Sequence, residues 1–163
     1  DRGYYAEHNL TLARHPSETD ERMMVRILAF ALDADERLLF GRGISSDDEP
    51  ALWLKDDTGR ILKWIEVGLP DERLLRRAAG RADEVIVLAY GGRTVDIWWQ
   101  KDLATLSKLN NLKVLSIAQE DSRALAALAE RNMLLTCTIQ DGQIWFSAGE
   151  TTLAIVLRPV FPG

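Results

Sequence analysis

A hairpin, a helix and an apolar strand in succession constrain the fold of this chain most. Two β-rich runs, residues 51–55 and 60–67, flank a turn in which Gly59 suits a left-handed backbone position. An arginine-rich helix is predicted after Pro70, and residues 84–90 then form a near-continuous apolar run, which is typical of a strand buried on both faces. A strand that follows a hairpin and a helix predicts a crossover connection, in which the helix packs against the sheet and the strand returns to it.

The register of the hairpin decides which acidic side chains can meet. Pairing Leu52 with Trp64 keeps apolar residues together, and in that register Asp48 and Glu66 become diagonal neighbours on one face. A register shifted by one residue would bring Glu49 across from Glu66, but it would break the apolar pairs. The favoured register pairs Asp56 with Arg60, Leu54 with Leu62, Leu52 with Trp64, Pro50 with Glu66, and Asp48 with Gly68.

Two carboxylates at this spacing predict a bound cation. They repel each other unless a cation or a basic side chain lies between them. Magnesium is held in this way by few protein oxygens and several waters, and manganese is a possible substitute. We therefore expect Asp48 and Glu66 to hold a divalent cation. Glu21 lies near the start of a predicted helix over residues 17–32, where it either caps the helix, the favoured interpretation, or points into a site.

The helix after Pro70 carries a basic stripe. Arg73, Arg77 and Arg81 recur every four residues, and Arg76 lies beside them. Base rates favour a solvated face paired with nearby acids, and nucleic-acid binding is the alternative. Since the net charge of the whole chain is −5, such binding would need a local basic surface set against an acidic remainder.

Length and composition limit which class of protein this chain can belong to. With 163 residues, 47% of them hydrophobic and 28% charged, we predict one globular domain over residues 1–163. The chain opens at Asp1 in the middle of a pattern, so we expect an N-terminal segment to be missing. A single cysteine, Cys137, indicates a reducing compartment. No signal peptide or long apolar run is found in the sequence, which predicts a soluble, cytoplasmic protein without a membrane partner.

Several common chemistries have no support in the sequence. One cysteine and two histidines, His8 and His15, are too few for a zinc site. The pair Gly91-Gly92 lacks the lysine and hydroxyl residue that continue a phosphate loop, and no serine stands in a nucleophile elbow.

The rest of the chain alternates strands and helices. The predicted strands end in an antiparallel unit joined by a turn at residues 140–143, and Pro159 and Pro162 are expected to end the last strand. All five tryptophans fall in predicted strands, which favours core packing over base stacking. Strands are expected at residues 5–13, 36–41, 97–99, 113–117, 133–139, 144–147 and 152–157, and further helices at 102–108 and 121–131.

Six short sequence motifs, spread over nearly the whole chain, are distinctive. They are LARHPSET at residues 12–19, ERMM at 21–24, DDEP at 47–50, WIE with GLPDER at 64–73, IWWQ at 97–100 and TIQDG at 138–142. In these stretches the sequence resembles the bacterial YaeQ family, which is poorly characterised. The order of elements, with Asp before Glu in the hairpin, also resembles the core of the PD-(D/E)xK, or restriction-endonuclease-like, superfamily.

The superfamily resemblance implies a mixed β-sheet flanked by helices and a metal-dependent nuclease site. In that pattern Asp48 and Glu66 match the metal-binding acids, and Glu21 matches the acid that the first helix often contributes. The departure is Gly68, where the superfamily usually carries a lysine that orients the attacking water or stabilises developing charge. Glycine can do neither.

A cation from elsewhere would have to replace that lysine. Arg73 or Arg77 on the basic helix, or Lys101 just after Gln100, are the candidates. Arginine stabilises charge well but is a poor base, so water activation would fall mainly to the metal.

Two hypotheses follow from different classes of function. The first is a magnesium-dependent phosphodiesterase acting on nucleic acid, with a degenerate site. The second is a non-catalytic module on the same fold, which binds nucleic acid or a protein partner through the arginine helix. A fold does not by itself decide between them.

Overall fold

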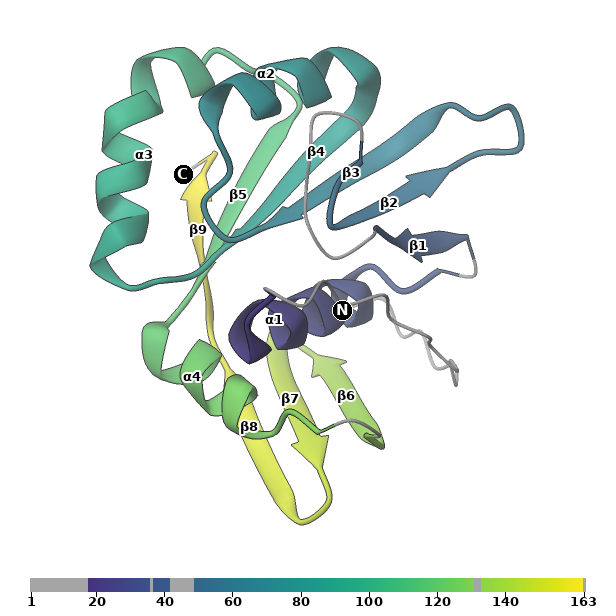
Figure 1. The fold of residues 1–163 in the computed structure, drawn as a ribbon, viewed down its shortest axis with the longest axis vertical. Coiled ribbons are helices and arrows are strands. Elements are labelled where there is room, and N and C mark those ends of the chain that lie inside the picture. Colours follow the sequence, from purple (N-terminus) through teal and green to yellow (C-terminus); the bar gives the residue numbers. More distant parts are fainter. Residues whose placement is uncertain (1–17, 36, 42–48, 131–132, 163) are drawn as a thin grey trace.

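The computed structural model describes residues 18–35, 37–41, 49–130 and 133–162, and Figure 1 shows their arrangement. A six-stranded mixed sheet has the order β1-β2-β3-β4-β5-β9, and a three-stranded sheet has the order β6-β7-β8. The helices are α1 (Asp20–Leu32), α2 (Glu72–Arg81), α3 (Arg93–Leu106) and α4 (Gln119–Ala127). The strands are β1 (Leu38–Phe40), β2 (Leu52–Lys55), β3 (Ile61–Val67), β4 (Ala82–Ala89), β5 (Leu112–Ile117), β6 (Leu135–Gln140), β7 (Gln143–Ala148), β8 (Thr151–Ile155) and β9 (Leu157–Phe161).

The predicted mixed sheet flanked by helices is confirmed. Strand β4 runs parallel to both β3 and β5, whereas β1, β2 and β9 join antiparallel. Residues 85–89 of β4 are all buried, so the apolar run lies at the centre of the sheet as the sequence predicts. The strand predicted at residues 5–13 lies outside the described residues.

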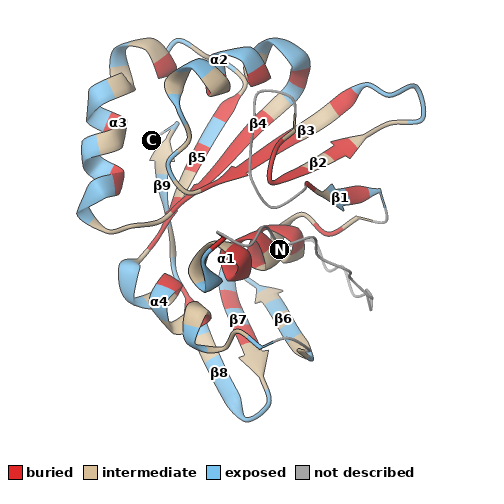
Figure 2. Cartoon of the chain, viewed as in Figure 1, coloured by how far each residue is buried: buried red, intermediate tan, exposed pale blue. Residues whose placement is uncertain are grey.

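Two apolar clusters lie on the two faces of the large sheet. On one face α2 and α3 pack against Trp64, Val85 and Val87. On the other face α1 packs against Ile65 and Leu88. Figure 2 shows the buried residues of the central strands between these helical layers. Because side chains alternate along a strand, neighbouring residues of β3 belong to different clusters.

Helix α1 is buried on more than one side because it lies between the two sheets (Figure 1). Its cluster includes Ile144 and Phe146 of β7 as well as residues of the large sheet. The helix begins two residues later than predicted, because its N-cap is Thr19 and not Ser17. The Thr19 hydroxyl accepts a hydrogen bond of 3.1 Å from the backbone N–H of Arg22.

The predicted hairpin register is wrong over most of the hairpin. The turn pairs as expected, with the Asp56 N–H donating to the Arg60 carbonyl at 2.9 Å, but an irregularity between Leu54 and Lys55 shifts the register by one residue. A bulge of this kind inserts an unpaired residue on one strand. Beyond it the pairs are Leu52 with Ile65, Trp53 with Trp64 and Leu54 with Lys63.

A second prediction that is wrong concerns residues 97–99. They belong to the helix α3, not to a strand, and the separate short helix expected at 102–108 is the end of the same helix. The aromatic pair Trp98-Trp99 favoured a strand by propensity. The burial of Val95, Trp99 and Leu106 shows the helical spacing instead.

The C-terminal antiparallel unit is confirmed as the sheet of β6, β7 and β8. The chain does not stop there, because β9 returns to the large sheet and pairs antiparallel with β5. Pro159 lies within β9, at the edge of the sheet, where a residue without an N–H is tolerated. Within the described part of the chain, no helix is long and apolar enough to cross a membrane.

Candidate functional site

Glu66 is fully buried near the carboxyl end of β3, with a relative exposure of 0%. Its Oε2 accepts a hydrogen bond of 2.9 Å from the indole Nε1 of Trp64, and its Oε1 accepts one of 3.4 Å from the backbone N–H of Ala51. The bond to Trp64 places the carboxylate on the face covered by α2 and α3. A buried carboxylate needs hydrogen-bond donors or cations around it, and the N–H groups of Trp64 and Ala51 are two such donors.

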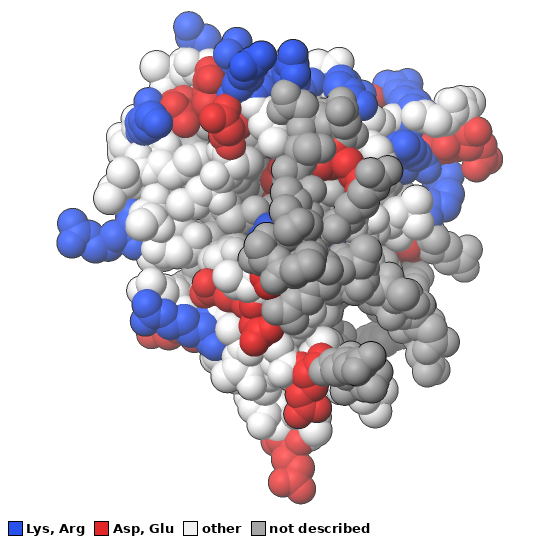
Figure 3. Space-filling model, in the orientation of Figure 1, with Lys and Arg blue, Asp and Glu red and all other residues white. Residues whose placement is uncertain are grey.

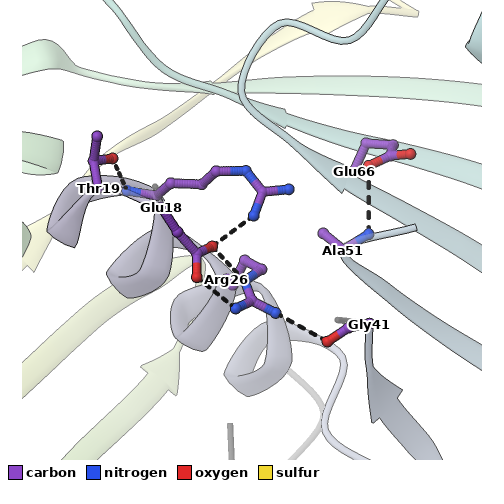
Figure 4. A network of polar contacts seen from close by, with 7 residues as sticks. Glu18, Thr19, Arg26, Gly41, Ala51 and Glu66 are labelled. Atoms are coloured by element: carbon purple, nitrogen blue, oxygen red, sulfur yellow. Dashed lines mark hydrogen bonds and ion pairs between the residues drawn. The ribbon is translucent and has the colours of Figure 1, made fainter. Parts of the chain in front are cut away.

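A chain of polar contacts joins Glu66 to the start of α1, and Figure 4 draws the contacts at both of its ends. The Ala51 carbonyl accepts from the Gly41 N–H at 2.8 Å, and the Gly41 carbonyl accepts from Nη1 of Arg26 at 3.4 Å. The Arg26 guanidinium in turn forms two hydrogen bonds to the Glu18 carboxylate, of 2.7 and 2.8 Å. Arg26 and Glu18 are buried, so a buried ion pair fixes the residue before α1 to that helix, and hydrogen bonds through Gly41 and Ala51 connect the pair to Glu66.

Glu18 also binds a second arginine. Nη1 of Arg22 lies 2.5 Å from Oε2 of Glu18, and the Arg22 side chain is 18% exposed. The sequence does contain a sign of this network, because Glu18, Arg22 and Arg26 recur every four residues and so lie on one side of a helix. Sequence reasoning missed it.

Glu21 does not join Glu66 among the described residues. Its Oε2 accepts a hydrogen bond of 2.7 Å from the hydroxyl of Ser122 on α4. Helix α1 also covers the face of the large sheet opposite to that of Trp64 and Glu66. The interpretation of Glu21 as a partner of Glu66 at a cation therefore has no support in this geometry.

Tyr90 follows β4 and lies beside Gly68: a Cβ built on Gly68 would be 3.7 Å from a ring carbon of Tyr90. Burial raises the pKa of the Tyr90 phenol above its ordinary value, and the charge of Glu21 adds to this, while Arg22 acts against it. Gly68 itself has a φ of +90°, a conformation that glycine adopts readily. Among the described residues, therefore, a tyrosine ring lies beside Gly68.

Asp48 lies outside the described residues, so its approach to Glu66 stays a prediction. The shifted register puts Ala51 beside Glu66, where Pro50 was expected. Glu49 is half-buried, and its Oε1 would lie 3.3 Å from a Cβ built on Gly41. Among the described residues there is no group of three His, Cys, Asp or Glu side chains that could hold a metal ion.

The arginines of α2 lie on an exposed surface. Arg73, Arg76, Arg77 and Arg81 are all exposed, and Figure 3 shows basic side chains gathered over α2 at the top of the molecule. Arg76 forms an ion pair of 2.8 Å with Glu72 one turn earlier. The basic stripe predicted from the sequence is therefore present at the surface of this helix. Part of the basic face is paired with an acid, as is common for exposed arginines.

Arg81 links this surface to the buried acid. Its guanidinium carbon lies 5.1 Å from the centre of the Trp64 ring, a cation–π distance, and Trp64 is the residue that donates to Glu66. Lys101 and Gln100 are exposed on α3. Sequence reasoning placed Trp64 in the core but missed its role between a carboxylate and an arginine.

Comparisons with known proteins find relatives that match nearly the whole chain. The family described as "YaeQ protein" matches residues 1–157. The uncharacterized protein YaeQ of Escherichia coli K12 is 46% identical over 157 residues, which cover 96% of this chain and 87% of that protein. The YaeQ protein of Salmonella typhi shows the same identity and coverage.

Two solved structures have the same fold. The crystal structure of the YaeQ protein from Xanthomonas axonopodis pv. citri superposes with a TM-score of 0.92 at 47% identity, covering 98% of this chain and 90% of that one. The crystal structure of the YaeQ protein from Pseudomonas syringae superposes with a TM-score of 0.93 at 36% identity, covering 99% of this chain and 89% of that one. With its family match and its fold in agreement, this chain belongs to the YaeQ family.

Proposed function

We propose that the protein binds nucleic acid along the exposed face of α2. The observation that carries this proposal is the concentration of exposed arginines on one short helix of a chain whose net charge is −5. Such a local basic surface attracts phosphates despite the acidic remainder of the molecule, because at physiological salt charges act over about 8 Å. A nucleic-acid partner is consistent with a cytoplasmic protein.

The geometry of α2 suits a phosphate backbone. Residues four apart in an α-helix are about 6 Å apart along its axis, so Arg73, Arg77 and Arg81 form an evenly spaced basic row. Arginine is also suited to phosphate, because its planar guanidinium can donate two parallel hydrogen bonds.

The helix is held firmly at both ends, which keeps this row in place. Asp71 caps its start, where the carboxylate accepts a hydrogen bond of 2.7 Å from the Arg73 N–H. The preceding Pro70 carbonyl accepts one of 2.8 Å from the indole of Trp98 on α3. At the other end the Asn111 side chain donates to the carbonyls of Ala79 and Ala82 at 2.9 and 3.1 Å. A preorganised surface loses less entropy on binding.

A second candidate function is cleavage of the bound phosphodiester, on the pattern of the PD-(D/E)xK superfamily. Magnesium or manganese would be held by Asp48 and Glu66. The observation that favours this candidate is Glu66 itself, a buried acid near the carboxyl end of a parallel strand, which is where ligands of such sheets commonly bind. Glu66 alone does not make a metal site, and a protein partner for α2 is the remaining alternative.

One pair of assays separates these functions. Binding of short single- and double-stranded DNA is measured against salt concentration, and cleavage of the same DNA is measured with and without magnesium or manganese. Binding that falls steeply with salt and depends on Arg73 and Arg77 supports the first function. Cleavage that needs the metal and Glu66 supports the second, and a wild-type protein that does neither at low salt contradicts both.

A further inference from the structure

Lys55, the last residue of β2, lies against an aromatic ring. Its ammonium nitrogen is 3.7 Å from the centre of the Trp53 ring, which is a cation–π contact. Among the described residues Lys55 forms no ion pair, whereas the nearby Arg60 is paired with Asp83 at 2.8 Å. The charge of Lys55 is therefore held in one place without being neutralised by an acid of the described chain.

Two tryptophans connect Lys55 to the end of α2. Trp53 and Trp64 are partners in the pairing of β2 with β3, and their rings meet edge to face with centres 5.9 Å apart. The guanidinium carbon of Arg81 lies 5.1 Å from the centre of the Trp64 ring. One line of contacts on the face of the sheet beside α2 therefore contains Arg81, Trp64, Trp53 and Lys55.

Lys55 extends the basic row of α2 sideways, across β3 to β2. Ile61 pairs with Ala82, which directly follows Arg81, and also with Lys55, so the end of α2 and the end of β2 lie at the same end of the sheet. Figure 3 shows basic side chains over α2 and further ones on the side of the molecule where Figure 1 places the hairpin of β2 and β3. The basic surface is therefore wider than α2 alone.

The aromatic rings of this surface are covered by its cations. Trp64 is fully buried, and the Lys55 ammonium lies over the half-buried ring of Trp53. These two are the only aromatic side chains of β2, β3 and α2. Proteins that bind single strands combine a basic groove with aromatic rings on which the bases stack. This surface therefore offers cations without a platform for stacked bases.

We propose that the nucleic acid bound by α2 is double-stranded, and that Lys55 is a further phosphate contact on it. This inference rests on the proposed function of α2 and names the class of nucleic acid that its surface suits. A duplex carries one phosphate charge per about 1.7 Å of its axis, twice the density of each strand in it, so a surface that binds through charge favours the duplex. Contacts with phosphates carry no sequence information directly, so affinity should not depend on base sequence.

Trp53 is a positioning residue in this proposal, because it holds Lys55 in place. A lysine side chain loses rotamer freedom when it is fixed, and a side chain that is ordered before binding loses less of that freedom on binding. Trp53→Leu, which removes the ring under the ammonium, should therefore weaken binding of duplex DNA, whereas Trp53→Phe, which keeps a ring, should retain most of it. In a protein that already carries Lys55→Gln, Trp53→Leu should have no further effect on binding.

The experiment measures the binding of a short DNA duplex and of its separate strands at several salt concentrations. We expect the wild type to bind the duplex at least about ten-fold more tightly than either strand at low salt. Duplexes rich in A·T and in G·C pairs should bind within about two-fold of each other.

Lys55→Gln should weaken duplex binding and make the slope of log K against log salt shallower by about 1. Lys55→Arg, which keeps the charge, should retain the slope of the wild type. The matched control is Lys113→Gln. Since the neighbours of Lys113 on β5, Leu112 and Val114, belong to the cluster under α2 and α3, the exposed Lys113 lies on the opposite face of the sheet. Its loss should leave the slope unchanged.

Two results would overturn the inference while the function of α2 stands. One is a single strand bound as tightly as the duplex. The other is a slope that Lys55→Gln leaves unchanged in a protein whose slope does become shallower with Arg73→Gln and Arg77→Gln. If the wild type binds neither form of DNA at low salt, the proposed function fails and the inference fails with it. Melting temperatures of the variants equal to that of the wild type ensure that lost binding is not lost folding.

Discussion

The indole N–H of Trp64 donates a 2.9 Å hydrogen bond to the carboxylate of Glu66, two residues further along the same strand. Both side chains are fully buried. The guanidinium carbon of Arg81, on the basic helix, lies over the Trp64 ring at 5.1 Å from its centre. Trp64 therefore contacts both the buried acid and an arginine of the proposed nucleic-acid surface.

Removing the Glu66 carboxylate should destabilise the fold. Glu66→Ala leaves the N–H groups of Trp64 and Ala51 without this acceptor and opens a cavity, so we expect a loss of about 2 to 4 kcal/mol in the free energy of unfolding. Urea denaturation measures it. Glu150→Ala, at an exposed turn, is the matched control, and equal effects of the two substitutions would show that Glu66 has no special role in the fold.

The ion pair between Glu18 and Arg26 should be costly to break on one side. Arg26→Ala leaves a buried carboxylate with fewer partners, and we expect a loss of about 3 kcal/mol or more. Replacing both residues, Glu18→Leu with Arg26→Met, should recover much of that loss because no unpaired charge is left. A double-mutant cycle in urea gives the coupling free energy, and Arg123→Ala on the exposed side of α4 is the control. A coupling near zero would contradict this account.

Cys137 should react slowly in the folded protein. Burial raises the pKa of its thiol from 9.0 to about 11, so near pH 8 the reactive thiolate is about 100-fold less abundant than in an unfolded chain. Because the folded pKa is the higher one, its contribution to stability is present below pH 9 and is lost as the pH rises towards 11. Labelling with a disulfide reagent, with and without urea, tests this, and equal rates in both conditions would refute it.

If the protein cleaves nucleic acid, Glu66→Gln should abolish cleavage. An amide is a weaker ligand for a hard cation than a carboxylate, so the metal would be lost. The affinity of the Glu66→Gln variant for DNA in the absence of metal should stay within about two-fold of the wild type, because the arginines of α2 are intact. The measurement is cleavage of labelled DNA with magnesium or manganese. Cleavage that persists in Glu66→Gln would remove Glu66 from the proposed chemistry.

The parts of the fold that follow from periodicity could be predicted from the sequence. The continuous apolar run of β4 identified the central strand, and Pro70, Asp71 and the spacing of Leu75 and Ala78 identified α2. At Trp98-Trp99 aromatic propensity favours a strand, whereas the helical spacing of Val95, Trp99 and Leu106 favours the helix that the structure shows. That spacing was available in the sequence.

The candidate site was harder to predict because it depends on local irregularity. One bulge between Leu54 and Lys55 moves the register, and a pattern of period two does not reveal where such a bulge falls. The hydrogen bond of Glu21 to Ser122 joins residues 101 positions apart, so no local pattern could indicate it. The basic row on α2 was predictable because it lies within one helix.

The salt dependence of DNA binding tests the central claim most directly. For a short duplex, each phosphate contact contributes about −0.9 to the slope of log K against log salt. Arg73→Gln with Arg77→Gln should therefore weaken binding at low salt and make the slope shallower by about 2. The control Arg123→Gln with Arg158→Gln changes the net charge equally at exposed positions away from α2 and should leave the slope near that of the wild type. Equal changes in both double variants, or no binding of DNA by the wild type at low salt, would contradict the account.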